Sequence, residues 1–343
     1  MSSTPSNPTL SRTLGALLGV HAGDSLGATL EFQSWREINS KLPRGLHEII
    51  GGGVFNWPAG HATDDTDLTR AVLLAYLERE KAKAKSKNET TSDFDITKIT
   101  AEIMLTWLKG SWPARTPGIE PRDIGGATRI GLSRYENTRD PYHCGAGRGQ
   151  AGNGSLMRCI PTALFTHTPE KRKKESIDIS AITHDDSRCT VACAAYNEIV
   201  AALVEGKSVE EAVGTGVAAV KESNVEIASK SILAAIEQGK GMDLAKMARE
   251  GPEDFNAVGF VIHSLVLAIA ALYDERSFED VLVDIVQIGG DTDTNGAIAG
   301  GLLGAKYGVE AIPEKWLSKL QFRKEFEDTA QLILEMQNGG IEG

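Results

Sequence analysis

Apolar residues recur along most of this chain at the 3.6-residue spacing of an amphipathic α-helix, and this periodicity constrains the fold more than any other feature. Leu68, Val72 and Tyr76, for example, fall on one face of such a helix. Runs that alternate apolar and polar residues are scarce, so the sequence predicts an all-α fold. The same spacing predicts further helices over residues 96–108, 191–204, 225–236, 258–272, 278–288, 298–307 and 326–336.

We expect these helices to form a single domain over residues 11–340, preceded by about ten disordered residues (1–10). Small residues dominate 296–305, and small residues let helix backbones approach closely, which suits a tightly packed bundle. Two polar stretches, residues 78–93 and 169–176, are interpreted as solvated loops or frayed helix ends. Neither has the character of a domain linker, because matching motifs lie on both sides of each.

The net charge of the chain is −11, from 36 Lys and Arg against 47 Asp and Glu. This charge argues against general binding to nucleic acid or to an anionic membrane, because phosphates need clustered basic side chains. The chain shows no secretory signal, its longest apolar run (265–273) is too short to span a bilayer, and four cysteines are too few for a disulfide framework. We therefore expect a monomer in the cytoplasm, with the nucleus as an alternative location.

Two acidic clusters, each expected to open a helix, carry the strongest chemical signal. They are residues 63–67 (TDDTD) and 289–295 (GGDTDTN). Helix capping explains one or two acids at such a position, but not three acids within five residues. Carboxylates and threonine hydroxyls are hard oxygen ligands, so the clusters predict a site for two Mg²⁺ or Mn²⁺ ions. An EF-hand is rejected because Leu302 stands where its loop needs a bidentate Glu, and the histidines lack the spacing of a zinc site.

A glycine-rich segment, residues 145–158, is the second signal. Gly147, Gly149 and Gly152 match the letters G-x-G-x-x-G. No buried strand precedes them and Arg172 stands where an acid is expected, so a dinucleotide-binding fingerprint is rejected. Two interpretations stay open: a loop leading into a helix whose N–H groups hold a phosphate, or a structural turn.

Three shorter segments carry polar residues that also have ordinary structural explanations. Asp24 and Glu31 are acids in a glycine-rich apolar stretch, where a cap or a salt bridge is the usual role. Asp123 precedes an expected helix and would suit its N-cap. His184 precedes another expected helix, where a histidine is more often structural than catalytic.

Taken together and in order, these segments resemble the ADP-ribosylglycohydrolase family, from Gly15 to about Tyr307. The resemblance implies a compact all-α orthogonal helix bundle with a central cleft that holds two Mg²⁺ or Mn²⁺ ions. The segment DIGGATR, which begins at Asp123, resembles the arginine-directed branch of the family. The motifs that carry the resemblance begin at Gly23, Thr63, Asp123, Gly152, Thr183 and Gly289.

The resemblance also implies an activity, the hydrolysis of the glycosidic bond at C1″ of ADP-ribose. This reaction would release ADP-ribose from a modified protein side chain, preferentially arginine, or from a small conjugate. The implied metal ligands are Thr63, Asp64, Asp65, Asp291, Asp293 and Thr294. The implied substrate-binding residues are Asp123, Gly125, Gly152, Asn153, Gly154, Ser155, Met157 and His184. The implied catalytic residues are Glu31, Asp64, Asp65 and Asp293, with Glu31 a candidate for handling the attacking water or guarding the site.

Three positions depart from the family pattern, namely Asp67, Gly126 and Gln150. They bear on which modified side chain is accepted, so serine-linked or O-acetyl ADP-ribose is an alternative substrate. A catalytically weak ADP-ribose-binding relative is an alternative function. A class I terpene synthase is also all-α with two acidic clusters, but Leu68 stands where its first cluster needs an acid and only 6% of residues are aromatic.

Overall fold

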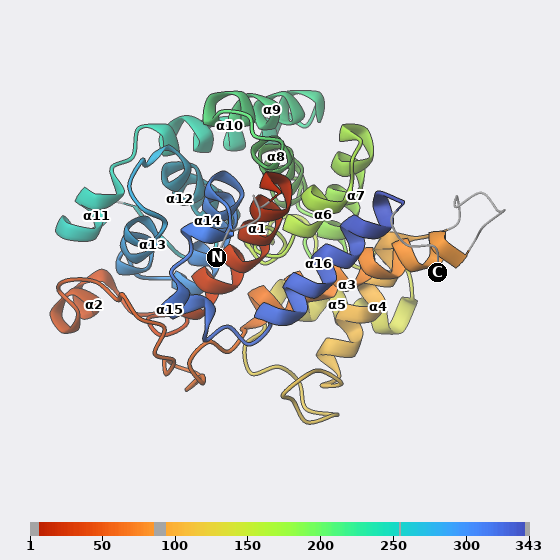
Figure 1. The fold of residues 1–343 in the computed structure, drawn as a ribbon, viewed down its shortest axis with the longest axis horizontal. Coiled ribbons are helices and arrows are strands. Elements are labelled where there is room, and N and C mark those ends of the chain that lie inside the picture. Colours follow the sequence, from red (N-terminus) through yellow and green to blue (C-terminus); the bar gives the residue numbers. More distant parts are fainter. Residues whose placement is uncertain (1–6, 86–93, 254, 340–343) are drawn as a thin grey trace, which may run out of the picture.

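The protein is described here by a computed structural model, in which residues 7–85, 94–253 and 255–339 are placed (Figure 1). Within these ranges, β-structure is limited to isolated bridges such as Ser34–Gly289, and the all-α prediction is confirmed. The helices in chain order are α1 (Pro8–Gly27), α2 (Trp35–Lys41), α3 (Asp64–Lys85), α4 (Ile96–Leu108), α5 (Gly126–Thr138), α6 (Ile160–Phe165), α7 (Pro169–Ala181), α8 (Ser187–Val204), α9 (Val209–Glu222), α10 (Glu226–Lys240), α11 (Leu244–Glu250), α12 (Val261–Tyr273), α13 (Phe278–Gln287), α14 (Thr292–Tyr307), the 3₁₀ turn η2 (Val309–Ala311), α15 (Glu314–Leu317) and α16 (Arg323–Gln337).

Each stretch with helical periodicity forms a helix within a few residues of its expected ends. The two acidic clusters open α3 and α14, as predicted. The apolar helix α12 packs against α8, α10 and α14, which explains why its sequence is apolar on almost every face. No helix in the described ranges is both long enough and apolar enough to cross a bilayer.

The expectation of a solvated loop or frayed end at residues 169–176 is wrong, because these residues begin the ordered helix α7. Pro169 occupies its first turn, where a missing N–H costs nothing. Glu170, Lys171 and Lys174 are exposed as expected, but Arg172 and Glu175 are buried and paired. Arg172 donates two hydrogen bonds, of 2.7 and 2.8 Å, to the Glu198 carboxylate on α8. Glu175 accepts from Arg79 of α3 at 3.1 Å.

The N-terminal segment also differs from expectation. Helix α1 begins at Pro8, inside the ten residues expected to be disordered, because Asn7 caps it by accepting from the N–H of Thr9 at 3.1 Å. Residues 1–6 lie outside the described part of the chain. The polar stretch 78–93 is helical up to Lys85, where α3 ends, and its remaining residues are likewise outside the described ranges.

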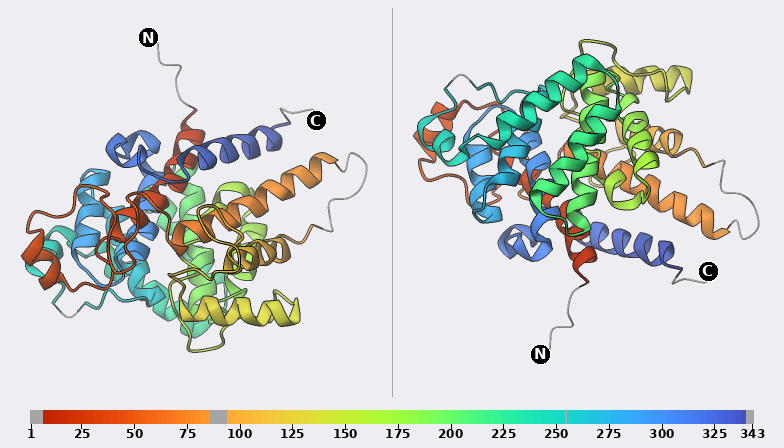
Figure 2. Two further views of the ribbon diagram at one scale, coloured as in Figure 1. Left: turned by 90° about the horizontal axis from the view of Figure 1, so that it is seen from below. Right: turned by 90° about the horizontal axis from the view of Figure 1, so that it is seen from above.

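Helices α1 and α14 lie side by side and antiparallel at the centre of the molecule (Figure 1). Glycines every four residues on α1 face the backbone of α14 so closely that no side chain fits between them. A Cβ added at Gly19 would lie 2.2 Å from the carbonyl oxygen of Gly300, and one added at Gly23 would lie 2.0 Å from that of Gly296. The small residues of 296–305 are therefore explained by this contact. Helix α16 packs against the outer side of α1 and against α3 (Figure 2).

Because the α1–α14 contact leaves no space, Gly19→Ala is expected to destabilise the fold. Overpacking of this kind costs roughly 1–3 kcal/mol. Gly214 lies on the exposed face of α9 with nothing within 4 Å of an added Cβ, so Gly214→Ala is expected to raise the free energy of unfolding by about 0.5–1 kcal/mol. Urea unfolding of both variants measures the difference. Equal stability of the two variants would contradict the tight-contact explanation.

Candidate metal and ligand site

The end of α1 and the starts of α3 and α14 meet at one place, and this meeting builds the candidate site. Asp24 near the end of α1 caps α3: its Oδ2 accepts from the N–H groups of Thr63 and Thr66 at 3.1 and 3.2 Å and from the Thr66 hydroxyl. Thr292 in the first turn of α14 donates to the Gly27 carbonyl of α1 at 2.7 Å. Both acidic clusters are thus fixed to the same end of the same helix.

Carboxylates from separate parts of the chain converge there. One carboxylate oxygen from each of Glu31, Asp291 and Asp293 lies within 4.8 Å of the others. Asp65 joins this cluster through the Thr294 hydroxyl, which approaches Asp65 Oδ2 to 3.5 Å. The Asn153 amide donates to Asp291 Oδ2 at 2.7 Å and so connects the cluster to the glycine-rich loop.

Burial and mutual repulsion raise the pKa values of these acids. Desolvation, followed by the charges of Asp123 and Asp291, raises the pKa of Glu31 to about 9. The pKa values of Asp64, Asp65 and Asp293 are also raised well above their usual range, first by desolvation and then by neighbouring carboxylates. No Lys or Arg among the described residues forms an ion pair with any of them. Cations would relieve this repulsion.

Several oxygens of the cluster are available as ligands. Glu31 Oε2, Asp65 Oδ1 and Asp293 Oδ1 are buried and accept no hydrogen bond from any described residue. A buried polar oxygen without a partner is costly, and coordination of a hard divalent cation would satisfy it. The residues present therefore fit the Mg²⁺ or Mn²⁺ ions implied by the sequence, and Glu31, which was expected to be catalytic, stands among the candidate ligands.

A cavity of about 820 Å³ opens beside the acidic cluster and is called here the ligand cavity. Its walls bring together most of the residues singled out in the sequence, whereas Thr63, Asp65 and Ser155 do not reach it. Thr63 and Asp65 are buried, and the Thr63 hydroxyl donates a hydrogen bond to Asp65 Oδ2 at 3.2 Å. The predicted site residues that line the cavity are Glu31, Asp64, Asp123, Gly125, Gly152, Asn153, Gly154, Met157, His184, Asp291, Asp293 and Thr294.

The glycine-rich loop supplies one wall of the ligand cavity. No hydrogen bond among the described residues uses the N–H groups of Gly152 or Gly154, and both residues line the cavity, so these groups are free to bind an anion. The hydroxyl of Ser155, in contrast, accepts from Ser180 at 2.9 Å inside the core. The glycine-rich segment does lead into a helix, but this helix, α6, begins only at Ile160, and residues 154–158 form turns.

His184 supports this loop. Its ring lies so close to the chain that a Cβ added at Gly154 would come within 2.9 Å of it. Burial, with a smaller contribution from the Arg158 charge, lowers the pKa of His184 to about 3, so the imidazole is neutral. Its Nδ1 is 2.8 Å from the Thr183 hydroxyl. His184 therefore has a structural role that the sequence suggested, and its ring also faces the ligand cavity.

Two acids lie differently from the simplest expectations. Asp123 is not the N-cap of α5, because Gly125 occupies that position without a side-chain bond. Its Oδ2 has no partner among the described residues, and desolvation, then the charges of Asp24 and Asp291, raises its pKa to about 7. Asp67 was expected near the carboxylates that bind metal. Its own carboxylate instead accepts hydrogen bonds from the indole N–H groups of Trp107 and Trp112, at 2.9 and 2.7 Å.

Sequence reasoning missed several residues that line the ligand cavity, among them Phe32, Arg188 and Phe260. Phe32 follows Glu31 directly but adopts a φ of 63°, which turns the chain and leaves the ring 65% exposed. The Arg188 guanidinium lies 5.6 Å from the ring centre of Phe260. The sequence gives no signal for either feature. The position of Phe32 depends on an unusual backbone angle, and the contact between Arg188 and Phe260 joins segments that are far apart in the sequence.

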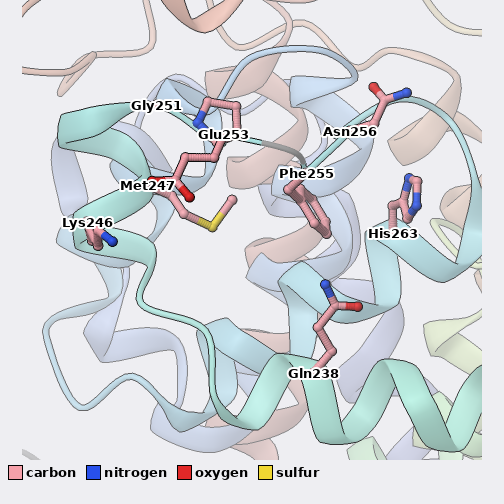
Figure 3. Close-up of a pocket in the computed structure, with 9 residues that line it drawn as sticks. Gln238, Lys246, Met247, Gly251, Glu253, Phe255, Asn256 and His263 are labelled. Carbon is pink, nitrogen blue, oxygen red and sulfur yellow. The ribbon is translucent and has the colours of Figure 1, made fainter.

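Another cavity, of about 400 Å³, lies between α10, α11 and the segment before α12 (Figure 3). Gln238, Met247, Phe255 and His263 point into it, and it contains none of the predicted site residues. Among the described residues that line it, Glu253 is the single acid, and these residues form no carboxylate cluster of the kind that a divalent cation needs. The predicted site residues are therefore concentrated at the ligand cavity and not at this one.

Comparison with known proteins agrees with this geometry. The profile of the ADP-ribosylglycohydrolase family matches residues 5–341. An ADP-ribosyl-[dinitrogen reductase] glycohydrolase of Rhodospirillum rubrum is 31% identical over 336 residues, covering 96% of this chain and 97% of the relative. An ADP-ribosylarginine hydrolase of Pseudomonas putida is 26% identical, covering 95% of this chain and 78% of the relative.

A solved structure described as an ADP-ribosylglycohydrolase-related protein complex has a TM-score of 0.67 and 27% identity, covering 96% of this chain and 98% of that one. The similarity therefore extends over nearly the whole of both chains and does not depend on isolated motifs. It rules out the terpene synthase alternative. The acidic clusters, the glycine-rich loop and these comparisons show together that the chain belongs to the ADP-ribosylglycohydrolase family.

Proposed function

We propose that this chain is a divalent-metal-dependent hydrolase that releases ADP-ribose from modified arginine side chains, acting as a cytoplasmic monomer. The observation that carries the proposal is the convergence of Glu31, Asp291 and Asp293 at a cavity that the glycine-rich loop also lines. The family acts on ADP-ribosylated substrates, and the arginine preference is supported by the named activity of the Pseudomonas putida relative.

In this proposal each wall of the ligand cavity has a task. The free N–H groups of Gly152 and Gly154 would bind the diphosphate of ADP-ribose, Ser155 would continue the same turn behind them, and His184 would line the same path. Two Mg²⁺ or Mn²⁺ ions would be held by Thr63, Asp64, Asp65, Asp291, Asp293 and Thr294, with Glu31 close by. When bound, the ions would polarise the hydroxyls of the distal ribose and help to position a water.

The chain's own acids would handle the protons. Water would attack C1″ and its proton would pass to a nearby carboxylate such as Glu31, while the bond from C1″ to the guanidinium nitrogen breaks and its electron pair leaves with the nitrogen. The neutral guanidine released would then take up the proton and become the arginine guanidinium. The unpartnered carboxylate of Asp123 would pair with the guanidinium and hold the leaving group. A serine-linked substrate offers no cation for this carboxylate, which would then stay desolvated without a partner.

Metal dependence is tested with Asp293→Asn and with excess EDTA. Loss of a carboxylate at the centre of the cluster is expected to reduce the rate of hydrolysis by about 100-fold or more. Mutation of a residue that only supports a metal ligand already lowers metal affinity or activity 10- to 100-fold. Helical content should not change, and EDTA should lower the melting temperature by about 4 °C. Asp328→Asn, an exposed change on α16, is the control. Full activity in EDTA or in Asp293→Asn would refute the metal site.

Ligand binding is tested by calorimetry with ADP-ribose, AMP and ribose. ADP-ribose should bind well and stabilise the protein by about 2.7 kcal/mol at 100 times its Kd, whereas AMP and ribose should do so far less. Gly154→Val should abolish binding, because a side chain there would displace His184 and block the loop. Gly214→Ala serves as the control. Unchanged ADP-ribose affinity in Gly154→Val would show that the diphosphate binds elsewhere.

Linkage preference is tested with arginine-linked, serine-linked and O-acetyl ADP-ribose. The arginine conjugate should be hydrolysed fastest, and Asp123→Ala should slow it at least tenfold, or about 1.4 kcal/mol, while ADP-ribose affinity stays nearly constant. Because Asp123 is not a helix cap, the variant should keep its stability. Equal rates on the serine and arginine conjugates would refute the arginine assignment, and ADP-ribose binding without any hydrolysis would indicate a non-catalytic relative.

A further inference from the structure

A third cavity, of about 280 Å³, adjoins the ligand cavity and is called here the side cavity. Thr63, Asp64 and Asp123 belong to its wall, and Asp64 and Asp123 also line the ligand cavity. These two carboxylates therefore stand at the junction between the cavities. A group that is released from C1″ of ADP-ribose next to Asp123 would therefore lie at the entrance of the side cavity.

The side cavity has apolar walls and a carboxylate that is free to pair with a cation. Trp57, Pro58 and Ile119 supply apolar surface, and Asp123 supplies an unpartnered oxygen. Most of the other charged groups are already engaged, whereas Asp64 adds a second carboxylate at the junction. Glu120 pairs with Arg129, and Arg122 donates to the Phe55 carbonyl at 3.5 Å. Asp67 is bound by two indoles, and Arg115 donates to the carbonyl oxygens of Trp107 and Ile119 at 2.9 and 2.7 Å. An apolar channel that ends at a carboxylate suits an alkyl stem that carries a guanidinium.

Four rings connect the mouth of the ligand cavity to the side cavity and are called here the aromatic row: Phe32, Phe55, Trp57 and His61. Successive ring centres are 6.4, 5.8 and 4.9 Å apart, and the last pair is stacked at 19°. Phe32 lines the ligand cavity, whereas Trp57 and His61 line the side cavity. The row is continuous across the junction of the two cavities.

The loop that carries the row is held in place and presents apolar surface. Gly52 and Trp57 exchange two backbone hydrogen bonds of 2.8 Å, and Thr29 donates to the Gly51 carbonyl at 3.1 Å. Along the same loop, Ile50 and Val54 are 58% and 62% exposed. Exposed apolar residues gathered beside a cavity are typical of a binding surface. The Trp57 N–H is buried without a partner among the described residues and could donate to a carbonyl group.

We propose that the side cavity and the aromatic row bind the modified arginine and the polypeptide around it, while the ligand cavity binds the ADP-ribose. The inference rests on the function proposed above and deepens it by assigning a separate site to the protein part of the substrate. Trp57 is its specificity-determining residue. Its indole contacts the arginine stem, and Phe32 and Phe55 contact the flanking residues.

The inference is tested by comparing an ADP-ribosylated arginine peptide with ADP-ribose alone. Trp57→Ala is expected to raise the KM for the peptide at least tenfold and to change the Kd for ADP-ribose less than twofold. Trp57→Phe keeps an aromatic wall and should restore most of the peptide affinity. Ile227→Ala removes an exposed apolar side chain from α10, far from the cavity-lining residues in sequence, and should behave as the wild type.

Binding is also measured in the Asp293→Asn background, where the peptide should survive intact. There, the modified peptide should bind more tightly than ADP-ribose, and Trp57→Ala should remove that advantage. Equal affinities for modified peptide and ADP-ribose, or an unchanged KM in Trp57→Ala, would overturn the inference even if the enzyme is active. If the wild type hydrolyses no conjugate, the proposed function fails, and this binding comparison still decides whether the side cavity holds the polypeptide.

Discussion

The close contact between α1 and α14 is the constraint on which the rest of the structure depends. Glycines at every fourth position bring the two backbones together, so the end of α1 meets the start of α14. Glu31 then lies beside Asp291 and Asp293, although about 260 residues separate them in the sequence. Asp24 on the same helix holds the start of α3. One helix thus sets the positions of both acidic clusters.

The site concentrates negative charge in a place where water is largely excluded, and the fold supplies only part of the compensation. Acidic side chains in the first turns of α3 and α14 interact favourably with the N-terminal ends of those helices. This effect is smaller than the combined desolvation and repulsion that raise the pKa values of Glu31 and its neighbours. The protein therefore gives up stability in its metal-free form to keep a preorganised set of oxygen ligands.

Much of the fold and of the candidate site could be predicted from the sequence, since helical periodicity and acidic clusters are local signals. The same local reasoning failed at residues 169–176, because Arg172 and Glu175 find buried partners on other helices. It could not decide between helix capping and site chemistry for Asp123, which depends on where α5 begins. It also missed the aromatic row, because the positive φ of Phe32 and the stacking of Trp57 on His61 are properties of the folded loop.

The pairing of α1 with α14 also has a consequence for synthesis of the chain. The two helices are far apart in the sequence, so the partner of α1 is complete only after more than three hundred residues have been made. Until then the glycine face of α1 has no complementary surface and neither acidic cluster is complete. Contacts of such long sequence separation form slowly because of the loop-closure entropy. The nascent chain can therefore bring its two acidic clusters together only after α14 has been made.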